Sequence, residues 1–402
     1  MGTRDLSPDS SPADVRAVVR GDTDFAIDLY QQLRKGQKGN LVIGPYSISL
    51  AFAMQHAGAR ARTARQMERV LHFTLPSARL DAAFDRLSLD LASRQNRQVT
   101  LSIANRLFGD RLLGDLPVPF RKAFLRELTR NFAAPMASVD FSTRPEAVRK
   151  LINDWVADQT GGRIKDLIPK DQLTQDTVMV LVNAMYLNAR WADTFLRQRT
   201  TDQRFVRLDG TRVRVPTMHQ DQTLQVAVTD DVLAVELPYK GRELSMLLVM
   251  PTPGSFARFE KALDRRVLAD IVGDLDERFT MLALPRFSIR TRLDLGATLQ
   301  ALGMKDAFDP QAADLTGMTT LAPDEAPRLF IAKVFHQAFI TLAEKGTEAG
   351  AATAIVDEGT TGGAEDFVRA TFDHPFLWFI RDRETGTLLF MGRVVDPSDT
   401  GG

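Results

Sequence analysis

The stretch that decides the fold of this chain is Glu344–Thr361, EKGTEAGAATAIVDEGTT. It contains three glycines, four alanines and four threonines, and only Ile355 and Val356 are larger apolar residues. Apolar runs typical of buried strands flank it, LFIAKVFHQAFITLA on one side and HPFLWFIRD on the other. Loops of this length without secondary structure are usually functional or disordered. We therefore interpret the segment as a functional loop, with a flexible linker as the alternative.

The same segment can form a β-strand with one small, uncharged face. Successive side chains of a strand point to opposite sides, so every second residue faces the same way. Counting from Thr347, one face carries Thr347, Ala349, Ala351, Thr353 and Ile355, and the other face begins with Glu348. A bulky or charged residue on the first face would be costly in a close-packed interior. We expect a loop that can insert into an existing sheet as a strand.

The overall composition is that of a globular protein. The 402 residues are 44% apolar and 25% charged, which are ordinary values. Lys+Arg and Asp+Glu both total 51, so there is no basic excess for binding nucleic acid. No apolar run approaches the roughly 18 to 20 residues of a membrane span. We therefore expect neither nucleic acid nor a membrane as a partner.

Two further observations concern the cellular compartment of the protein. The chain has no cysteine, which excludes disulfides, thiolate metal ligands and a cysteine nucleophile and is compatible with either compartment. The first residues contain no apolar stretch that resembles a secretory leader. The protein is expected to be extracellular if a leader was removed before Met1, and cytoplasmic otherwise.

Helical and strand periodicities occupy two successive regions with no linker between them. Helical patterns recur up to Gly161–Gly162, and from about Thr177 the alternation typical of strands prevails, as in TVMVLVNAMYL. Helices followed by strands favour one α+β domain. We expect a single domain over residues 21–397, preceded by a flexible tail at residues 1–20 that is rich in Ser, Pro and Asp.

A search for catalytic and metal-binding motifs finds no site for an enzyme. None of the five histidines lies in an H-E-x-x-H motif or at metal-ligand spacing: His56, His72, His219, His336 and His374. There is no G-x-S-x-G motif, and Ser47 in GPYSIS opens an apolar stretch, which indicates a buried hydroxyl. In GDRLLGD, Asp115 stands where a phosphate-binding loop has lysine. We expect no catalytic residue, no metal and no cofactor.

Several motifs, in order along the chain, closely resemble the serpin family. They are GNLVIGPYSISLAFAMQHAGARARTARQMERVL, NAMYLNARWADTF, VELPYKGRELSMLLVMP, LPRFSIRTRLDLGATLQALGMKDAF, ADLTGM, IAKVFHQAFITLAEKGTEAGAATA and HPFLWFIRDRETGTLLFMGRVVDP. The resemblance covers nearly the whole chain and implies an α+β serpin fold with three β-sheets and about nine helices. It also implies an exposed reactive-centre loop, here at about residues 344–368.

The resemblance implies a function as well. Serpins of the inhibitory type trap a serine protease, so the expected partner is a serine protease in a covalent complex with a monomeric inhibitor. A non-inhibitory serpin that acts as a chaperone or binding protein is the alternative.

Candidate site residues follow from the same resemblance. The hinge of the loop maps onto Glu344, Lys345, Gly346, Thr347, Glu348, Ala349, Gly350, Ala351, Ala352 and Thr353. The group of residues called the shutter in this family maps onto Ser47, Asn183 and His336, and the breach tryptophan maps onto Trp191. Gly44 departs from the family's S-P-x-S motif, in which a serine precedes the proline. This departure removes one hydroxyl from the hydrogen bonds of the shutter.

The resemblance also places the reactive bond. The hinge glutamate of the family is usually the seventeenth residue before the cut, which makes Thr360–Thr361 the bond if Glu344 holds that position. This loop is a few residues longer than usual after that bond, so residues 362–364 remain alternatives and the cut is expected within about residues 358–365.

The residues around this bond predict the kind of protease. No Lys or Arg lies between Gly346 and Val368, which argues against trypsin-like enzymes, and Thr360 is small. Small substrate pockets belong to elastase-like or subtilisin-like proteases, and a glutamyl-specific protease cutting at Glu358 is a lesser alternative. Four acidic residues nearby favour a protease with a basic substrate cleft: Asp357, Glu358, Glu365 and Asp366.

Overall fold

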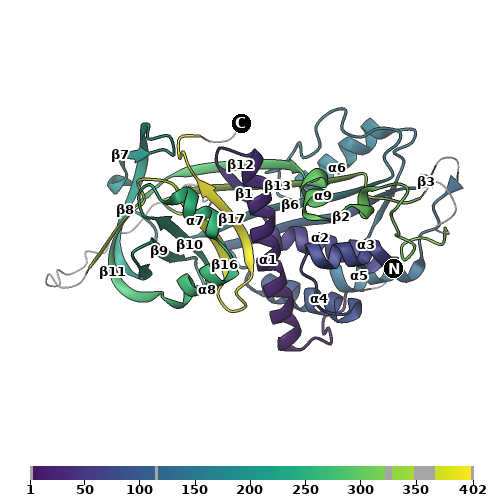
Figure 1. The fold of residues 1–402 in the computed structure, drawn as a ribbon, viewed down its shortest axis with the longest axis horizontal. Helices are drawn as coiled ribbons and strands as arrows, with labels where there is room; N and C mark the ends of the chain where they lie inside the picture. The colour runs from purple at the N-terminus through teal and green to yellow at the C-terminus, as the bar shows by residue number, and fades with distance from the viewer. Residues whose placement is uncertain (1–2, 114–115, 322–327, 348–366, 400–402) are drawn as a thin grey trace.

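The structure is a computed structural model that describes residues 3–113, 116–321, 328–347 and 367–399. In this part of the chain there are nine α-helices and three β-sheets, so the predicted α+β class is confirmed. Figure 1 shows an elongated molecule in which α2–α6 and α9 surround one end, while α7 and α8 pack on the other. Helix α1 crosses the middle of the view between the two ends.

The helices are mostly short and lie early in the chain. None of those in the described residues is both long and apolar enough to cross a membrane. They are α1 (Pro12–Gly36), α2 (Pro45–Gly58), α3 (Ala61–Val70), α4 (Ser77–Ser93), α5 (Lys122–Phe132), α6 (Pro145–Gln159), α7 (Phe256–Ala262), α8 (Arg265–Gly273) and α9 (Gly296–Leu302), with 3₁₀ turns at η1 (Arg197–Arg199) and η2 (Asp306–Phe308).

A six-stranded sheet spans the helical end of the molecule. Its strand order is β12 (Phe287–Asp294), β13 (Lys333–Ala343), β14 (Gly346–Thr347), β6 (Met179–Arg190), β2 (Val99–Asp110) and β5 (Ala137–Val139). The central strands β6 and β13 are parallel, whereas β12 with β13 and β2 with β6 are antiparallel. A parallel pair needs a long connection between its strands. Here the connection from β6 to β13 includes most strands of the nine-stranded sheet described next.

A nine-stranded sheet forms the other end. Its order is β1 (Leu41–Ile43), β17 (Leu388–Val394), β16 (Phe376–Asp382), β10 (Leu244–Pro251), β9 (Val232–Pro238), β8 (Arg212–Val228), β11 (Asp276–Pro285) and β15 (Val368–Thr371), with β7 (Thr201–Val206) paired to the first part of β8. The third sheet is the small pair β3 (Leu112–Leu113) and β4 (Leu116–Pro117).

Helix α2 is buried on nearly every side. Its sequence PYSISLAFAMQHAG is apolar around the whole circumference, which is the pattern of a helix enclosed by other elements. It packs against β2 and β6 of the six-stranded sheet, against β17 of the nine-stranded sheet, and against α1, α4 and α5. This central position brings the amino end of α2 against the middle of the six-stranded sheet.

Helix α1 begins earlier than the sequence analysis predicted. Residues 12–20, expected to be part of a flexible tail, form its first turns. The Ser11 hydroxyl caps the helix by accepting a hydrogen bond from the backbone N–H of Asp14, and the Asp14 carboxylate accepts one from the backbone N–H of Ser11. The Ser/Pro/Asp composition therefore marks a helix start rather than a loose segment. The limits of a single domain at 21–397 stay a prediction.

Candidate functional site

The central strands of the six-stranded sheet separate at one end. Strands β6 and β13 pair in parallel as far as Tyr186 and Phe339. Beyond this point the two-residue strand β14 lies between them, antiparallel to both. The chain reaches β14 from β13 by a tight turn at residues 344–345. The first part of the predicted hinge is therefore already a strand within the sheet.

The two residues of β14 fit closely into this opening. Thr347, predicted to be the first inward-facing side chain, is fully buried, and its hydroxyl lies 2.7 Å from the hydroxyl of Tyr239. Gly346 has a φ of +145°, and a Cβ there would lie 2.0 Å from the backbone oxygen of Ala189. Only glycine can adopt this conformation at such a close approach to a neighbouring strand.

Trp191, the predicted breach tryptophan, covers the end of the opening. Its indole N–H donates to the backbone oxygen of Ala343 at 3.0 Å, and its backbone N–H donates to that of Lys345 at 3.0 Å. The ring stacks on Tyr239 with a centroid distance of 4.6 Å. Through these contacts Trp191, the residue directly after β6, holds the turn between β13 and β14.

Glu344, the first hinge residue, is held at the same place. Its carboxylate accepts hydrogen bonds from the Thr200 hydroxyl at 2.7 Å and from the Arg286 guanidinium. Its backbone oxygen accepts from the N–H of Phe195 at 2.9 Å. Burial alone would raise the pKa of Glu344, but the bonds from Arg286 and Thr200 outweigh it, so the pKa is lowered. The charged form of Glu344 is thus favoured.

The predicted shutter residues come together where α2 meets the sheet. His336 of β13 and Asn183 of β6 are register partners, and the imidazole Nδ1 of His336 bonds to the amide oxygen of Asn183. The amide nitrogen of Asn183 donates to the hydroxyl of Ser47 in α2. The backbone N–H of Gly44 donates to Nε2 of His336 at 3.2 Å. We call Ser47, Asn183, His336 and Asn105, described next, the shutter cluster.

Asn105 of β2 completes this cluster, and the sequence analysis missed it. Its amide nitrogen donates to the backbone oxygen of Ser47 at 2.9 Å. Its amide oxygen accepts from the Ser47 hydroxyl at 3.2 Å and from the amide of Asn183 at 2.5 Å. A buried amide in the apolar strand VTLSIANRLFGD is the signal that could have found it.

The hydrogen bonds fix the tautomer of His336. Because Nε2 accepts a hydrogen bond from the N–H of Gly44, Nδ1 carries the proton and donates to Asn183. The imidazole is fully buried, and burial lowers the pKa of His336 to about 3. His336 is therefore neutral near pH 7, and a second proton would place two donors against each other at Gly44.

Met185 packs closely against Gly44, the position at which the family motif has a serine. A Cβ on Gly44 would lie 2.8 Å from Sδ and 3.3 Å from Cβ of Met185. The shutter cluster therefore lacks the hydroxyl noted from the sequence, but the backbone N–H of Gly44 keeps its bond to His336. The side chain of Met185 thus packs where the serine of the family motif would need room.

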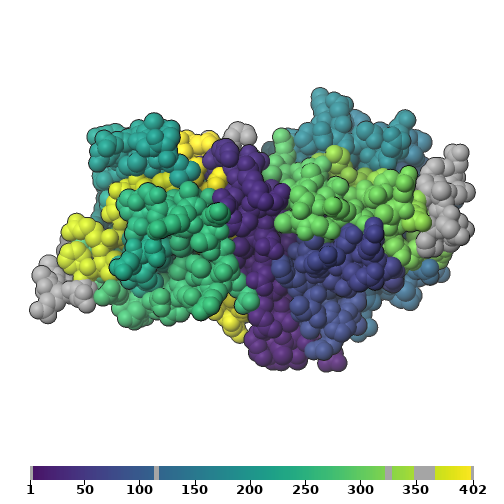
Figure 2. Space-filling model, in the orientation of Figure 1, coloured from purple at the N-terminus to yellow at the C-terminus, as the bar shows by residue number. Residues whose placement is uncertain are grey.

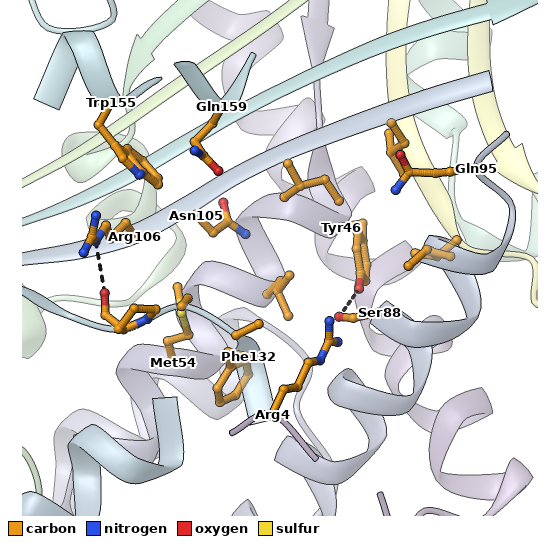
Figure 3. Close-up of a pocket in the computed structure, with 18 residues that line it drawn as sticks. Arg4, Tyr46, Met54, Ser88, Gln95, Asn105, Arg106, Phe132, Trp155 and Gln159 are labelled. Carbon is orange, nitrogen blue, oxygen red and sulfur yellow. Dashed lines mark hydrogen bonds between the residues drawn. The ribbon is translucent and has the colours of Figure 1, made fainter. Parts of the chain in front are cut away.

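A cavity of about 420 Å³ lies beside Asn105 (Figure 3). Its walls come from β2, α2, α4, α5 and α6, and they include Tyr46, Met54, Arg106 and Trp155. Side chains around such a space can rearrange with fewer clashes than those of a close-packed interior. Strand β2 and the shutter cluster thus border a place where the packing can change.

The remaining predicted site residues lie outside the described residues. They are Glu348, Ala349, Gly350, Ala351, Ala352 and Thr353 of the hinge, and Thr360 and Thr361 of the reactive bond. The described residues on either side of the loop are Thr347, in β14 of the six-stranded sheet, and those of β15, which pairs in parallel with β11 of the nine-stranded sheet. The loop therefore connects one sheet to the other.

Comparisons with known proteins identify the class of protein. Residues 20–397 match the family described as Serpin (serine protease inhibitor). The chain therefore belongs to the serpin family, as the sequence motifs indicated, and it has the serpin fold. Many members of this family are inhibitors of serine proteases rather than catalysts.

Three similar proteins show how far the likeness extends along the chain. A serpin-like protein of Thermococcus kodakarensis is 36% identical over 385 residues, covering 96% of this chain and 87% of the relative. The leukocyte elastase inhibitor of Bos taurus is 36% identical over 387 residues, covering 93% of this chain and 98% of the relative. The native thermophilic serpin tengpin superimposes with a TM-score of 0.84 at 26% identity, over 94% of each chain.

Proposed function

We propose that this protein inhibits serine proteases by trapping them as covalent acyl-enzymes while its cleaved loop inserts into the six-stranded sheet. The position of β14 is the observation that carries this proposal. Gly346 and Thr347 already pair with both β6 and β13, in the direction that a fully inserted strand would follow. The small, uncharged face predicted for the next residues suits the same opening.

The energy of insertion is sufficient for such a trap. A strand of about 12 residues adds on the order of a dozen backbone hydrogen bonds, each worth roughly 1 kcal/mol net. This sum is comparable with the ~5–15 kcal/mol that stabilises a typical domain, so it can distort an attached protease. A strand of about 16 residues also spans about 50 Å, which carries the protease along the length of the sheet.

The chemistry is supplied by the protease. Its serine attacks the carbonyl of the reactive bond, the peptide bond breaks, and the amine leaves with the C-terminal fragment. The ester that remains would normally be hydrolysed by water. Insertion of the loop distorts the oxyanion hole, whose donors are each worth roughly 10²–10³ in rate, and the ester then persists. The inhibitor contributes the sheet opening and the hinge.

The proposed targets are elastase-like or subtilisin-like proteases that cut at Thr360–Thr361. The support is the small residue before the bond and the absence of Lys and Arg between Gly346 and Val368. Mass spectrometry of the C-terminal peptide released during inhibition tests this assignment. A new N-terminus at Thr361 is expected, and one outside residues 358–365 would contradict it.

The proposed function itself is tested by incubation with subtilisin and with pancreatic elastase, followed by denaturing gels. We expect a band at the summed mass of inhibitor and protease that survives boiling in detergent, because the ester is covalent. A heat-inactivated protease serves as the control. Cleavage of the loop without such a band, and with unchanged thermal stability, would show that the protein is a substrate and not an inhibitor.

A further inference from the structure

The hairpin formed by β7 and the start of β8 carries an unusual set of charges. In its antiparallel register Arg204 lies directly opposite Arg214, and Arg212 lies opposite Val206. Because side chains alternate, these three arginines share one face, and all three are exposed. The opposite face is the packed one, with Phe205 and Val215 buried. We call Arg204, Arg212 and Arg214 the arginine face.

Local contacts do not explain the arginine face. Like charges directly opposite each other on two strands are destabilising. Within the described part of the chain, no ion pair involves any of the three arginines, although Asp202 lies on the same face. Two neighbouring arginines are paired, Arg199 with Asp221 at 2.6 Å and Arg207 with Asp396 at 2.5 Å. An arrangement that weakens the hairpin and leaves three cations available suggests an external anionic partner.

The position of the hairpin indicates which partner can reach it. At its start, Thr200 bonds to the hinge residue Glu344. At its end, the N–H of Val206 donates to the backbone oxygen of Asp373, which follows β15, at 2.8 Å. Strand β7 therefore runs between the two anchors of the reactive loop. Figure 2 shows this region as the teal block at the upper left, on the surface at that end of the molecule.

We propose that the arginine face is a docking surface for an acidic patch on the target protease, beside its substrate cleft. This inference rests on the proposed function. A protease bound to the reactive loop lies next to both anchors and so next to β7. Opposite charges outside the cleft accelerate encounter by long-range attraction, and the effect weakens with salt. The target would combine a cleft that accepts the acidic loop with an acidic surface nearby.

The test compares two forms of one protease that differ in surface charge. Subtilisin and succinylated subtilisin, in which lysine ammonium groups are converted into carboxylates, share the same active site. We expect the wild-type protein to trap the succinylated form about tenfold faster at low salt, and the difference to shrink at high salt. The double variant R204E/R214E should lose this preference.

The matched control is K122E/R126E, which makes the same change in net charge on exposed positions of α5. It should retain the preference, because α5 lies in the opposite half of the molecule from β7 (Figure 1). Equal effects of both double variants would show that only net charge matters and would overturn the proposal. The stoichiometry of inhibition should stay the same in R204E/R214E, since it depends on loop insertion.

Two further measurements separate the possible failures. If no covalent complex forms, binding to succinylated subtilisin with its catalytic serine changed to alanine still reports on docking, and salt-sensitive binding lost in R204E/R214E would support it. Covalent trapping at equal rates for both protease forms would overturn docking but leave the inhibitor function standing.

A competing explanation is that the arginines bind the loop's own carboxylates. If neutralising these in D357N/E358Q/E365Q/D366N abolishes the effect of R204E/R214E, the proposal is wrong.

Discussion

A single neutral imidazole joins the two strands that must separate in the proposed mechanism. His336 donates from Nδ1 to Asn183 and accepts at Nε2 from the N–H of Gly44. The bond from Gly44 requires the neutral form, because a protonated Nε2 cannot accept, and the site is fully buried. The charge of this residue therefore affects how β13 is joined to the start of α2 in the shutter cluster.

This gives a pH dependence with a definite sign. The pKa of His336 is about 3 in the folded protein and 6.5 when unperturbed. Above pH 6.5 both states are neutral there, and His336 contributes no slope. As the pH falls below 6.5, only the unfolded state binds the proton, so the free energy of unfolding falls by about 1.4 kcal/mol per pH unit. We expect this slope in the difference between wild type and His336→Gln, measured by urea unfolding.

Asp22 provides a control of opposite sign. Burial raises the pKa of Asp22 to about 7. Below pH 7 the folded state binds the proton first, so this group favours folding as the pH falls and opposes the slope from His336. Asp22→Asn should therefore steepen the loss of stability on acidification.

The His336 assignment would be contradicted if the difference in the free energy of unfolding between wild type and His336→Gln were constant from about pH 7.5 to pH 5.

Gly44 is a second residue whose effect can be measured. Gly44→Ser would place a Cβ 2.8 Å from Sδ and 3.3 Å from Cβ of Met185. The flexible Sδ can move but the Cβ cannot, so we expect a loss of about 1–3 kcal/mol in the free energy of unfolding. In a Met185→Ala background the loss should be smaller. Gly36→Ser, where a Cβ meets nothing within 4 Å, is the control and should change stability little.

Strand β14 is the element on which the proposed function depends. It contains only two residues, Gly346 and Thr347, yet it pairs on both sides and is covered by Tyr239 and Trp191. A strand this short is held by its surroundings rather than by its own hydrogen bonds. Side chains that cannot enter the opening should therefore remove it from the sheet.

Thr347→Arg should turn the protein from an inhibitor into a substrate. Thr347 is fully buried against Tyr239, and an unpaired guanidinium there would be costly, so insertion would slow and hydrolysis of the ester would win. The measurement is the number of inhibitor molecules consumed per protease inactivated, which should rise severalfold. Glu348→Arg, on the face predicted to remain in solvent, is the matched control. Trapping at one-to-one stoichiometry by Thr347→Arg would refute this role for β14.

At the scale of the whole molecule, the six-stranded sheet has only two residues between β6 and β13 in the part of the chain that the structure describes. Strands β6 and β13 pair only as far as Tyr186 and Phe339, and β14 occupies the remaining gap with two residues. A protease that nicks the loop without being trapped would let the rest of the loop enter the sheet. The nicked protein should then be more stable than the intact one, since new strand pairs form and the chain ends are free to move.

We expect this gain to appear in calorimetry as a rise of at least about 10 °C in the midpoint of unfolding after limited proteolysis within the loop. At about 2.1 cal/mol/K of unfolding entropy per residue, a rise of this size in a chain of 402 residues corresponds to about 8 kcal/mol. The nicked Thr347→Arg variant should show a much smaller rise, because its hinge cannot enter. An unchanged midpoint in the nicked wild type would mean that the loop does not insert.

Several features were accessible from the sequence because they depend on local composition. The α+β class follows from helical periods in the first part of the chain and strand alternation in the rest. The small residues after Glu344 indicate a segment that can become a strand, and Thr347 is indeed buried. Ser47, Asn183, His336 and Trp191 were assigned to the shutter and the breach by motif resemblance, and these roles stay predictions, although the structure brings the first three together. The early start of α1 was missed because its capping residues also mark turns.

Other features were decided only by the tertiary structure. The sequence determined the α+β class and predicted which segment can insert, since alternation and side-chain size are properties of neighbouring residues. It did not determine that β14 is already between β6 and β13, or that Asn105, Tyr239 and Arg286 hold the shutter cluster and the hinge. Apart from the turn that joins β13 to β14, these contacts link residues more than 50 positions apart, and no local pattern records such pairings. They exist because the packing of the two sheets around α2 brings distant strands to one place.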